Sequence, residues 1–472
     1  LELAVDRGVF GVIGRHDLRR GDAVDGGAAK PMRREDLQRR FENGGPVAGL
    51  DPTVAMPALL DHSRPYVFYQ QASRPVRTGG QVVDQVLFSL WVIVTFVQFR
   101  FDELILYPLA LYYAYSVWRN QVQILHLLKR AWILLLFPVW CLISPIWAVE
   151  PFDAFKQAIY LTLTMLICFQ VAIALTPRQI MHAVLIASGI IVVINFVYVF
   201  GFGRGIGVFQ QKNQMGKNMV VAWIVALFSA LDNRTPMPAR LAALVVAGLA
   251  AVCAMSSGSA TAVLLVLGTG AVGFFGYTMV RGGMLRASRL AVLFFMVAIA
   301  AWGLGTVVQT LDTSPKEAVL AAFGKDATLT GRTVLWHYAE QQIREEPLLG
   351  VGNGGFWRYF ESPLVRRIYE EFYKGPYDHF NFHNSYYETA VHQGLIGLGI
   401  AIIASLWALW WILRGVFELA TMPHIYFGCQ TIAVLLRTTT EADFLHHFVI
   451  FHMLFWIGAL VSLKVIRHEY VD

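Results

Sequence analysis

Cysteine is scarce in this chain, and the few cysteines present are not spaced for crosslinking. They stand singly inside apolar stretches, without a CxxC pair, at Cys141, Cys168, Cys253 and Cys429. Isolated cysteines of this kind act as small apolar side chains in a core. The sequence therefore predicts neither a disulfide framework nor a zinc site.

Nucleotide-binding loops and a cleavable leader are also missing. The glycine-rich segment 347–356 (PLLGVGNGGF) lacks the lysine and the strand–turn–helix setting of a phosphate-binding loop. It indicates a tight turn that packs closely on another element or on the mouth of the membrane domain. No apolar segment follows the early arginines, so the first apolar span is expected to be an uncleaved anchor. The first residue, Leu1, is not methionine, which leaves the true start open.

Apolar residues, by contrast, are too abundant for one soluble core. They make up 56% of 472 positions, and the mean hydropathy is +0.52. Part of this surface must therefore face lipid. A helix of about 15 to 22 apolar residues can cross about 30 Å of hydrocarbon, some only marginally. Such runs predict about 12 spans, at 82–99, 104–118, 131–148, 157–175, 180–200, 218–231, 241–255, 261–280, 290–310, 388–413, 423–436 and 445–463.

The sequence thus predicts an all-α, polytopic membrane protein with one large periplasmic loop that contains helices. Residues 1–80 mix both charges with many glycines and prolines, which is typical of a disordered cytoplasmic tail. Spans one to nine occupy 81–310, and three further spans and a short tail occupy 388–472. The loop domain between them, 311–387, is too long for a simple connection and is expected to be functional.

Basic residues predict how these spans are oriented, because lysine and arginine favour cytoplasmic loops. With the N-terminus inside, the inner loops hold Arg119, Lys129, Arg130, Arg178, Arg234, Arg240, Arg281, Arg286, Arg289, Arg414, Lys464 and Arg467. The short outer loops hold about half as many. Segment 201–217 breaks the rule, because it is an outer loop that carries Arg204, Lys212 and Lys217. Function is expected at such an exception.

Arg332 is a candidate anion-binding residue in the outer loop. Thr330 is predicted to cap a helix that ends before Pro347. The residues on its related faces are Leu335, Trp336, Ala339, Gln342 and Ile343. Arg332 then lies in the first turn, where free N–H groups and the positive dipole end already favour an anion. The alternative is an arginine that only solvates the loop.

His383 is a candidate general base. Ser385 and Glu388 fit an S-x-x-E capping box, which places His383 just outside the start of the tenth span. The positive end of that helix and the nearby arginines disfavour the imidazolium form, and a neutral ring suits a base. The alternative is a histidine that only hydrogen-bonds at the lipid interface. The shared side with the basic residues favours the base.

Segment 201–213 is a candidate phosphate-binding loop. Its alternating glycines free the backbone, and Arg204 and Lys212 bring positive charge to an outward-facing helix N-terminus. Arginine suits bidentate contacts with phosphate, whereas lysine acts as a point charge. Anchoring to lipid head groups is the alternative.

The order of several short motifs resembles the O-antigen ligase and Wzy-type polymerase superfamily. The motifs are 147–151 (WAVEP), 207–213 (GVFQQKN), 256–261 (SSGSAT), Gly331-Arg332, 347–352 (PLLGVG), His383-Asn384 and 393–397 (QGLIG). The resemblance covers about 130–464. Within the superfamily, 329–336 (LTGRTVLW) and Thr440-Glu441 lean toward the exopolysaccharide polymerases.

The resemblance implies a metal-independent, inverting glycosyl transfer at the periplasmic face of the bacterial inner membrane, with no cofactor. The donor would be an undecaprenyl-diphosphate-linked glycan, and the acceptor a glycan or lipid-linked glycan. By matched position, Arg332 and Arg204 would bind the diphosphate with the help of Lys212, and His383 would take the proton of the acceptor hydroxyl. The other implied substrate-binding residues are Asn213, Asn384, Trp336, Tyr387 and Glu441. Membrane lipids, a chain-length regulator and export proteins are implied partners; nucleic acid is not.

Several of these residues have simpler explanations. Glu150, Glu441 and Asp443 either orient an acceptor sugar or pair with Arg437. The aromatic residues Trp336, Trp357, Tyr386 and Tyr387 either stack on sugars or belong to interfacial belts. Adjacent histidines project to different helix faces, so His446, His447 and His452 are expected to be structural or interfacial and not metal ligands.

Other functions stay open beside the polymerase. A ligase would use the same donor but transfer glycan to lipid A-core, and a relative that glycosylates protein is a further variant. A secondary transporter or flippase fits the size and span number, but would bury charges near mid-membrane or show internal repeats. A non-enzymatic partner in an export complex would not need His383.

Overall fold

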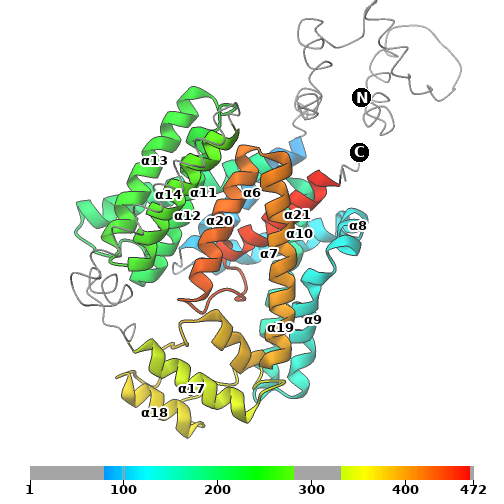
Figure 1. The fold of residues 1–472 in the computed structure, drawn as a ribbon, viewed down its shortest axis with the longest axis vertical. Coiled ribbons are helices and arrows are strands. Elements are labelled where there is room, and N and C mark those ends of the chain that lie inside the picture. The colour runs from blue at the N-terminus through cyan, green and yellow to red at the C-terminus, as the bar shows by residue number, and fades with distance from the viewer. Residues whose placement is uncertain (1–78, 98, 100, 281–330, 468–472) are drawn as a thin grey trace, which may run out of the picture. The chain divides into compact units, whose positions relative to one another are not determined.

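The computed structural model describes residues 79–97, 99, 101–280 and 331–467. All of them belong to one unit, Arg77–Asp472. Within these ranges every regular element is a helix, which confirms the predicted all-α class (Figure 1). The α-helices are α6 (Gly79–Phe96), α7 (Glu103–Arg119), α8 (Gln121–Ala131), α9 (Ile133–Ile143), α10 (Pro151–Ala174), α11 (Pro177–Phe196), α12 (Lys212–Leu231), α13 (Met237–Ser256), α14 (Ala260–Val280), α17 (Arg332–Glu345), α18 (Pro363–Glu371), α19 (Ser385–Arg414), α20 (Met422–Thr438) and α21 (Ile450–Ile466).

Each predicted span falls on one of these helices, except 290–310, which lies outside the described residues together with almost all of the predicted tail. Five helices are long and apolar enough to cross a membrane alone, namely α10, α11 with its extension to Gly201, α12, α13 and α19 with its extension to Leu419. Shorter apolar helices include the segments Gly80–Phe96, Thr261–Gly273 and Ile450–Ile466. The chain is therefore a multi-pass membrane protein, and the number of about twelve spans stays a prediction.

The predicted span 131–148 begins beside the start of α9, and α8, which precedes it, was not part of a predicted span. The chain bends by 95° between α8 and the following helix, and the two count as a sixth crossing only if taken together. In α8 only Ile124, Leu127 and Ala131 are buried, and Lys129 and Arg130 stand in its last turn. An amphipathic helix with a basic end is typical of one that lies along a membrane surface. The bend therefore coincides with the predicted start of the span.

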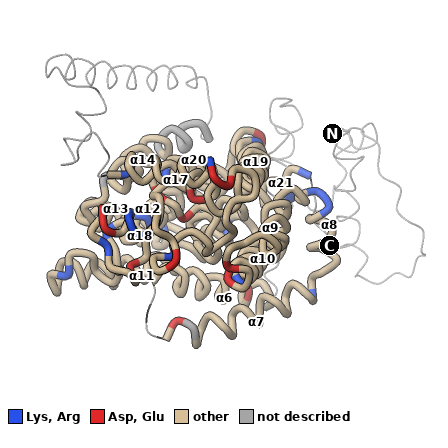
Figure 2. The backbone as a smooth tube through the Cα atoms, turned by 90° about the horizontal axis from the view of Figure 1, so that it is seen from below, with Lys and Arg blue, Asp and Glu red and all other residues tan. Residues whose placement is uncertain are grey.

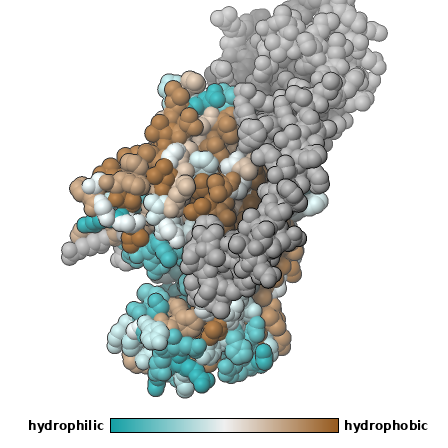
Figure 3. Space-filling view, turned by 60° about the vertical axis from the view of Figure 1, so that its left-hand side comes forward, coloured by the Kyte–Doolittle hydropathy of each residue, from teal (hydrophilic) through white to brown (hydrophobic). Residues whose placement is uncertain are grey.

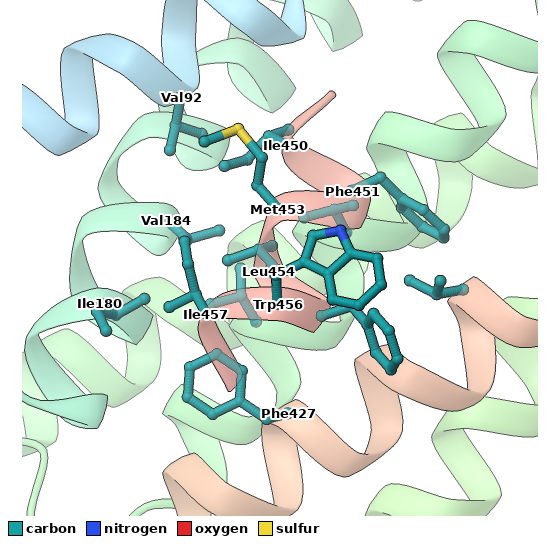
Figure 4. Packing of buried hydrophobic residues seen from close by; sticks show 14 of the residues in the cluster. Val92, Ile180, Val184, Phe427, Ile450, Phe451, Met453, Leu454, Trp456 and Ile457 are labelled. Atoms are coloured by element: carbon teal, nitrogen blue, oxygen red, sulfur yellow. The ribbon is translucent and has the colours of Figure 1, made fainter. Parts of the chain in front are cut away.

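The core of the helical bundle forms around α21, which is buried from Ile450 to Leu463. Figure 4 shows Val92 of α6, Val184 of α11 and Phe427 of α20 packed around it. A helix that is apolar on all sides needs neighbours on all sides. The four free cysteines are buried in their helices, as expected of small apolar side chains.

A smaller domain, residues 331–384, adjoins the first turns of α19. Figure 1 shows its helices α17 and α18 below the bundle, beside the lower end of α19. Hydrophilic side chains cover this part in Figure 3, whereas the bundle above exposes mainly apolar ones. Figure 2, seen from below, shows how few charged positions interrupt the helices. The separate core of this domain is formed by Leu335, Ala339, Val351, Phe356, Val365, Ile368, Tyr369, Phe382 and Val391.

Basic residues of the predicted inner loops lie at the helix ends away from this domain. Helix α9 starts beside Lys129 and Arg130, and the chain after it reaches the smaller domain, where Val149 N–H donates to Val351 O (3.0 Å). At the start of α11, Arg178 pairs with Asp232 beyond the end of α12 (2.9 Å). Lys129, Arg130 and Arg178 thus lie at helix ends away from the smaller domain, and the orientation of the chain in the membrane stays a prediction.

Glycines join the smaller domain to α19 through backbone contacts. Helix α19 breaks its helical geometry at Gly394 (φ 67°, ψ 179°), which frees carbonyl groups of the preceding turn. Val391 O accepts Val351 N–H (3.0 Å), and His392 O accepts Gly352 N–H (2.8 Å). A Cβ atom on Gly394 would collide with the carbonyl of Leu348. The segment 347–356 is therefore a close-packing turn, as predicted.

Replacing Gly394 with alanine is expected to destabilise the protein by more than about 2 kcal/mol, because its positive φ and the Leu348 carbonyl leave no room for a methyl group. Gly399→Ala is the matched control, since no atom lies within 4 Å of that position and alanine favours a helix. Thermal unfolding in detergent should show a lower midpoint for the first variant and little change for the second. Equal midpoints would contradict the packing described above.

Candidate functional site

Three predicted site residues meet around the carboxylate of a fourth, Glu441, which lies just after α20. Asn213 Nδ2 donates to its Oε1 at 2.9 Å, and Arg332 Nη2 lies 3.3 Å from the same oxygen. His383 Nδ1 lies 3.4 Å from Oε2. The side chains of Glu441 and Arg332 are 11% and 13% exposed, and that of His383 is 28% exposed. The imidazole is thus more accessible than Glu441 and Arg332.

Helix starts bring these residues together. Asn213 is in the first turn of α12, Arg332 is the first residue of α17, and His383 precedes Asn384, the N-cap of α19. Three positive helix ends thus face one region, which favours an anion there. Gly331, in a left-handed conformation, is the N-cap of α17, whereas Thr330 lies outside the described residues. The prediction that Arg332 lies in a first turn is confirmed.

The predicted capping box at Ser385 is wrong. Asn384 caps α19, because its Oδ1 accepts the N–H groups of Tyr386 (2.9 Å) and Tyr387 (3.3 Å). Ser385 instead donates its hydroxyl to Glu441 O (2.7 Å), which fixes the backbone of that residue. Glu388 accepts the N–H of Phe382 and not that of the N-cap. Asn and Ser are both good N-caps, so the choice between them depended on the tertiary contact with Glu441.

A second carboxylate, Asp443, gathers cations beside the first. Its Oδ2 lies 2.7 Å from Lys217 Nζ and 3.6 Å from Arg437 Nη2, and its Oδ1 lies 3.2 Å from His452 Nε2. The expected pairing with Arg437 is therefore confirmed for Asp443. Lys217 and His452 were not predicted as site residues. The signal for Lys217 was its place in the basic outer loop 201–217.

The charges around the two carboxyl groups lower their pKa values. Burial acts to raise the pKa of Glu441, but the His383 hydrogen bond and the charge of Arg437 outweigh it and leave the pKa below its usual value. Burial likewise opposes ionisation of Asp443, yet Lys217 and Arg437 hold its pKa well below the usual range. Both groups are therefore carboxylates at neutral pH.

The cluster carries more positive than negative charge. Arg332, Lys217 and Arg437 supply three positive charges against the two carboxylates of Glu441 and Asp443, with the histidines counted as neutral. Arg437 is only 4% exposed, and among the described residues its Nε has no hydrogen-bond partner. A buried cation with one unused donor favours a further anion as its partner.

Arg204 and Lys212 stand apart from the contacts of Glu441. Both are exposed; the Arg204 guanidinium lies 5.4 Å from the centre of the Tyr198 ring, and Lys212 is the first residue of α12, next to Asn213. Both lie in or next to the predicted loop 201–213. Unlike Asn213, neither has a described contact with the carboxylate of Glu441. Their role in phosphate binding stays a prediction.

The predicted sugar-stacking residues contact each other. The rings of Trp336 and Tyr387 are stacked at 5.7 Å with an interplanar angle of 20°. Trp336 Nε1 donates to Phe382 O (3.0 Å), and the Tyr387 hydroxyl donates to Glu340 (2.9 Å). One face of each ring is therefore occupied within the domain. Trp357 packs among the aromatic rings of the same core.

The remaining acidic and histidine residues have structural partners. Glu150 pairs with Arg358 at 2.7 Å, not with Arg437. The His447 ring packs on Tyr160 at 5.0 Å, and His452 contacts Asp443. Among residues 79–280 and 331–467, as far as they are described, no three His, Cys, Asp or Glu side chains gather as they would around a metal ion.

Comparison with known proteins agrees with this class of membrane protein. The O-antigen ligase family matches residues 242–402, a segment that includes Arg332 and His383. The chain is also 28% identical over 337 residues to the exopolysaccharide production protein ExoQ of Rhizobium meliloti (strain 1021). That match covers 69% of this chain and 75% of ExoQ. Both findings confirm the predicted resemblance to the O-antigen ligase and Wzy-type polymerase superfamily, including its lean toward exopolysaccharide proteins.

Asp443→Asn is expected to destabilise the protein at neutral pH, by on the order of 3 kcal/mol, because Lys217 and Arg437 would face an amide. A carboxyl group whose folded-state pKa is depressed adds stability above its unfolded-state pKa, about 3.9, and loses it as the pH falls through the folded value. Thermal unfolding midpoints between about pH 6 and about pH 3 should thus fall less steeply for the variant than for the wild type. Glu345→Gln, at an exposed position of α17, is the control and should keep the wild-type slope.

Proposed function

We propose that this protein is an inverting glycosyltransferase that polymerises undecaprenyl-diphosphate-linked oligosaccharide repeat units at the periplasmic face of the inner membrane. The observation that carries the proposal is the surplus of positive charge around Glu441 and Asp443, with the His383 ring at its accessible edge. A diphosphate leaving group is a polyanion, and fixed cations in a partly dry site lower the cost of its departure.

The reaction needs one displacement. The acceptor hydroxyl attacks the anomeric carbon of the donor sugar, the bond from that carbon to the diphosphate oxygen breaks, and the configuration inverts. His383 takes the hydroxyl proton as the new glycosidic bond forms, and the undecaprenyl diphosphate leaves with the electron pair of the broken bond. Arg332, helped by Lys217 and Arg437, faces the charge that develops on the leaving group.

Glu441 prepares His383 for this role. With Nδ1 turned toward the Glu441 carboxylate, the ring carries its proton on that side and keeps a lone pair on Nε2 for the acceptor hydroxyl. The same carboxylate stabilises the imidazolium that forms after proton transfer, as an acid does in hydrolytic triads. Glu441 would thus set the tautomer of His383, a role that the sequence analysis did not assign to it.

The position of the charges favours a surface enzyme over a transporter. Asn213 and Lys217 lie in the first two turns of α12, and Arg437 lies in the last turn of α20. A transporter would be expected to place such groups near mid-membrane. The basic helix ends opposite the smaller domain support a cytoplasmic location for those ends and a periplasmic site.

The polymerase is favoured over the ligase by the match to an exopolysaccharide production protein. A ligase would use the same cations and base and would differ in its acceptor, lipid A-core. Analysis of the products separates the two: a ladder of repeat units supports the polymerase, and glycan joined to a lipid core supports the ligase.

His383→Ala is expected to lower the turnover of a purified lipid-diphosphate glycan in liposomes by about 10²- to 10⁴-fold. Arg332→Ala is expected to lower it by about 10²- to 10³-fold, because one group that faces the leaving charge is lost. His379→Ala and Arg344→Ala are the controls; His379 is exposed, and Arg344 shares α17 with Arg332 at 75% side-chain exposure. If His383→Ala keeps full turnover, His383 is not the general base.

Removal of divalent ions tests the metal-independent mechanism. Liposomes treated with a chelator are expected to form product at the untreated rate, since protein cations supply the charge stabilisation. Activity that disappears with chelator and returns with a divalent ion would show that the mechanism uses a metal.

A further inference from the structure

The backbone at His383 has a left-handed conformation that residues with a side chain rarely adopt. Its φ is +49°. Such a conformation costs on the order of 1 to 3 kcal/mol and persists where the surroundings hold it in place. The groups that hold it therefore decide where the imidazole lies.

Side chains from two helices bind the peptide groups next to His383. The N–H of Phe382 donates to Glu388 Oε2 of α19 at 2.9 Å, and the carbonyl of Phe382 accepts Trp336 Nε1–H of α17 at 3.0 Å. The N–H of His383 itself donates to Asn381 Oδ1 at 2.9 Å. Both backbone polar groups of Phe382 are thus hydrogen-bonded. Glu388, in the first turn of α19, accepts the N–H, and Trp336 donates to the carbonyl.

Three N–H or ring-nitrogen groups face the carboxylate of Glu388. Besides Phe382 N–H, it accepts Trp357 Nε1–H at 2.9 Å, and His392 Nε2 lies 3.2 Å from its Oε1. His392 Nδ1 lies 2.9 Å from Gly352 O. Both ring nitrogens of His392 thus face oxygen atoms. Glu388 and His392 together join α19 to the glycine turn.

We propose that Glu388, held by His392, is a positioning residue for His383. It does not touch the substrate; it fixes the Phe382 peptide so that the imidazole stays between Glu441 and the acceptor hydroxyl. The inference rests on the proposed function, in which His383 is the base. A misplacement of about 1 Å at a catalytic group costs about 10²-fold in rate.

An amide cannot replace this carboxylate. In Glu388→Gln one oxygen becomes an NH₂ donor, so the N–H of Phe382 or that of Trp357 would face another N–H. We expect kcat to fall by about 10- to 100-fold. The KM for the lipid-linked donor should change little, because Arg332, Lys217 and Arg437 do not contact Glu388.

A double-mutant cycle with His383→Ala tests whether Glu388 acts through His383. Single-turnover rates are measured in liposomes for the wild type, each single variant and the double variant. If Glu388 only positions the base, Glu388→Gln causes no further loss in the His383→Ala background. An equal loss in both backgrounds, or unchanged kcat in the single variant, overturns the inference.

Trp336→Phe decides the question if Glu388→Gln does not fold. It removes the donor to Phe382 O but keeps an aromatic ring beside Tyr387. A fall in kcat that vanishes in the His383→Ala background supports the inference; an unchanged kcat overturns it. Glu361→Gln, a change of the same kind at a carboxylate with 57% side-chain exposure, is the control. If the wild-type protein itself catalyses no glycosyl transfer, the proposed function is wrong.

Discussion

The site depends on an imbalance of charge that is held in place where the helices of the bundle meet the smaller domain. Two carboxylates, Glu441 and Asp443, collect three cations and do not neutralise them. In a partly dry environment this arrangement is costly when empty and favourable when an anion of high charge enters. The carboxylates thus keep the cations close together without neutralising all of their positive charge. The proposed diphosphate chemistry needs this property more than it needs any single residue.

Hydrophobic runs predicted the helices well because membrane spans are set by local composition. Each span outside 290–310 falls on a helix. Helix α8 was not predicted as a span because it is amphipathic and ends in Lys129 and Arg130, so local composition does not mark it as a membrane crossing. The cap of α19 was misassigned because two good capping residues are adjacent, and the distant Glu441 carbonyl takes one of them.

The sequence predicted several residues of the site, but it did not predict that they meet around Glu441. Arg332, His383 and Asn213 belong to motifs on one predicted side, so their proximity followed from the orientation. Glu441 became the hub because α20 ends beside the starts of three other helices, an arrangement that no local pattern encodes. Arg437 was predicted only as an ion-pair partner and Lys217 only as part of the basic loop; that the two cations share Asp443 is visible only in three dimensions.

The break at Gly394 has a mechanical consequence for catalysis. Before Gly394, the first turns of α19 are hydrogen-bonded to the glycine turn of the smaller domain; after it, the helix continues as an apolar rod. Rods of this kind tilt when the hydrocarbon layer thins or thickens. Because the first turns are fastened to the glycine turn, we expect such tilting to be taken up at Gly394. We therefore expect the imidazole of His383 to keep its place while the lipid around the protein changes.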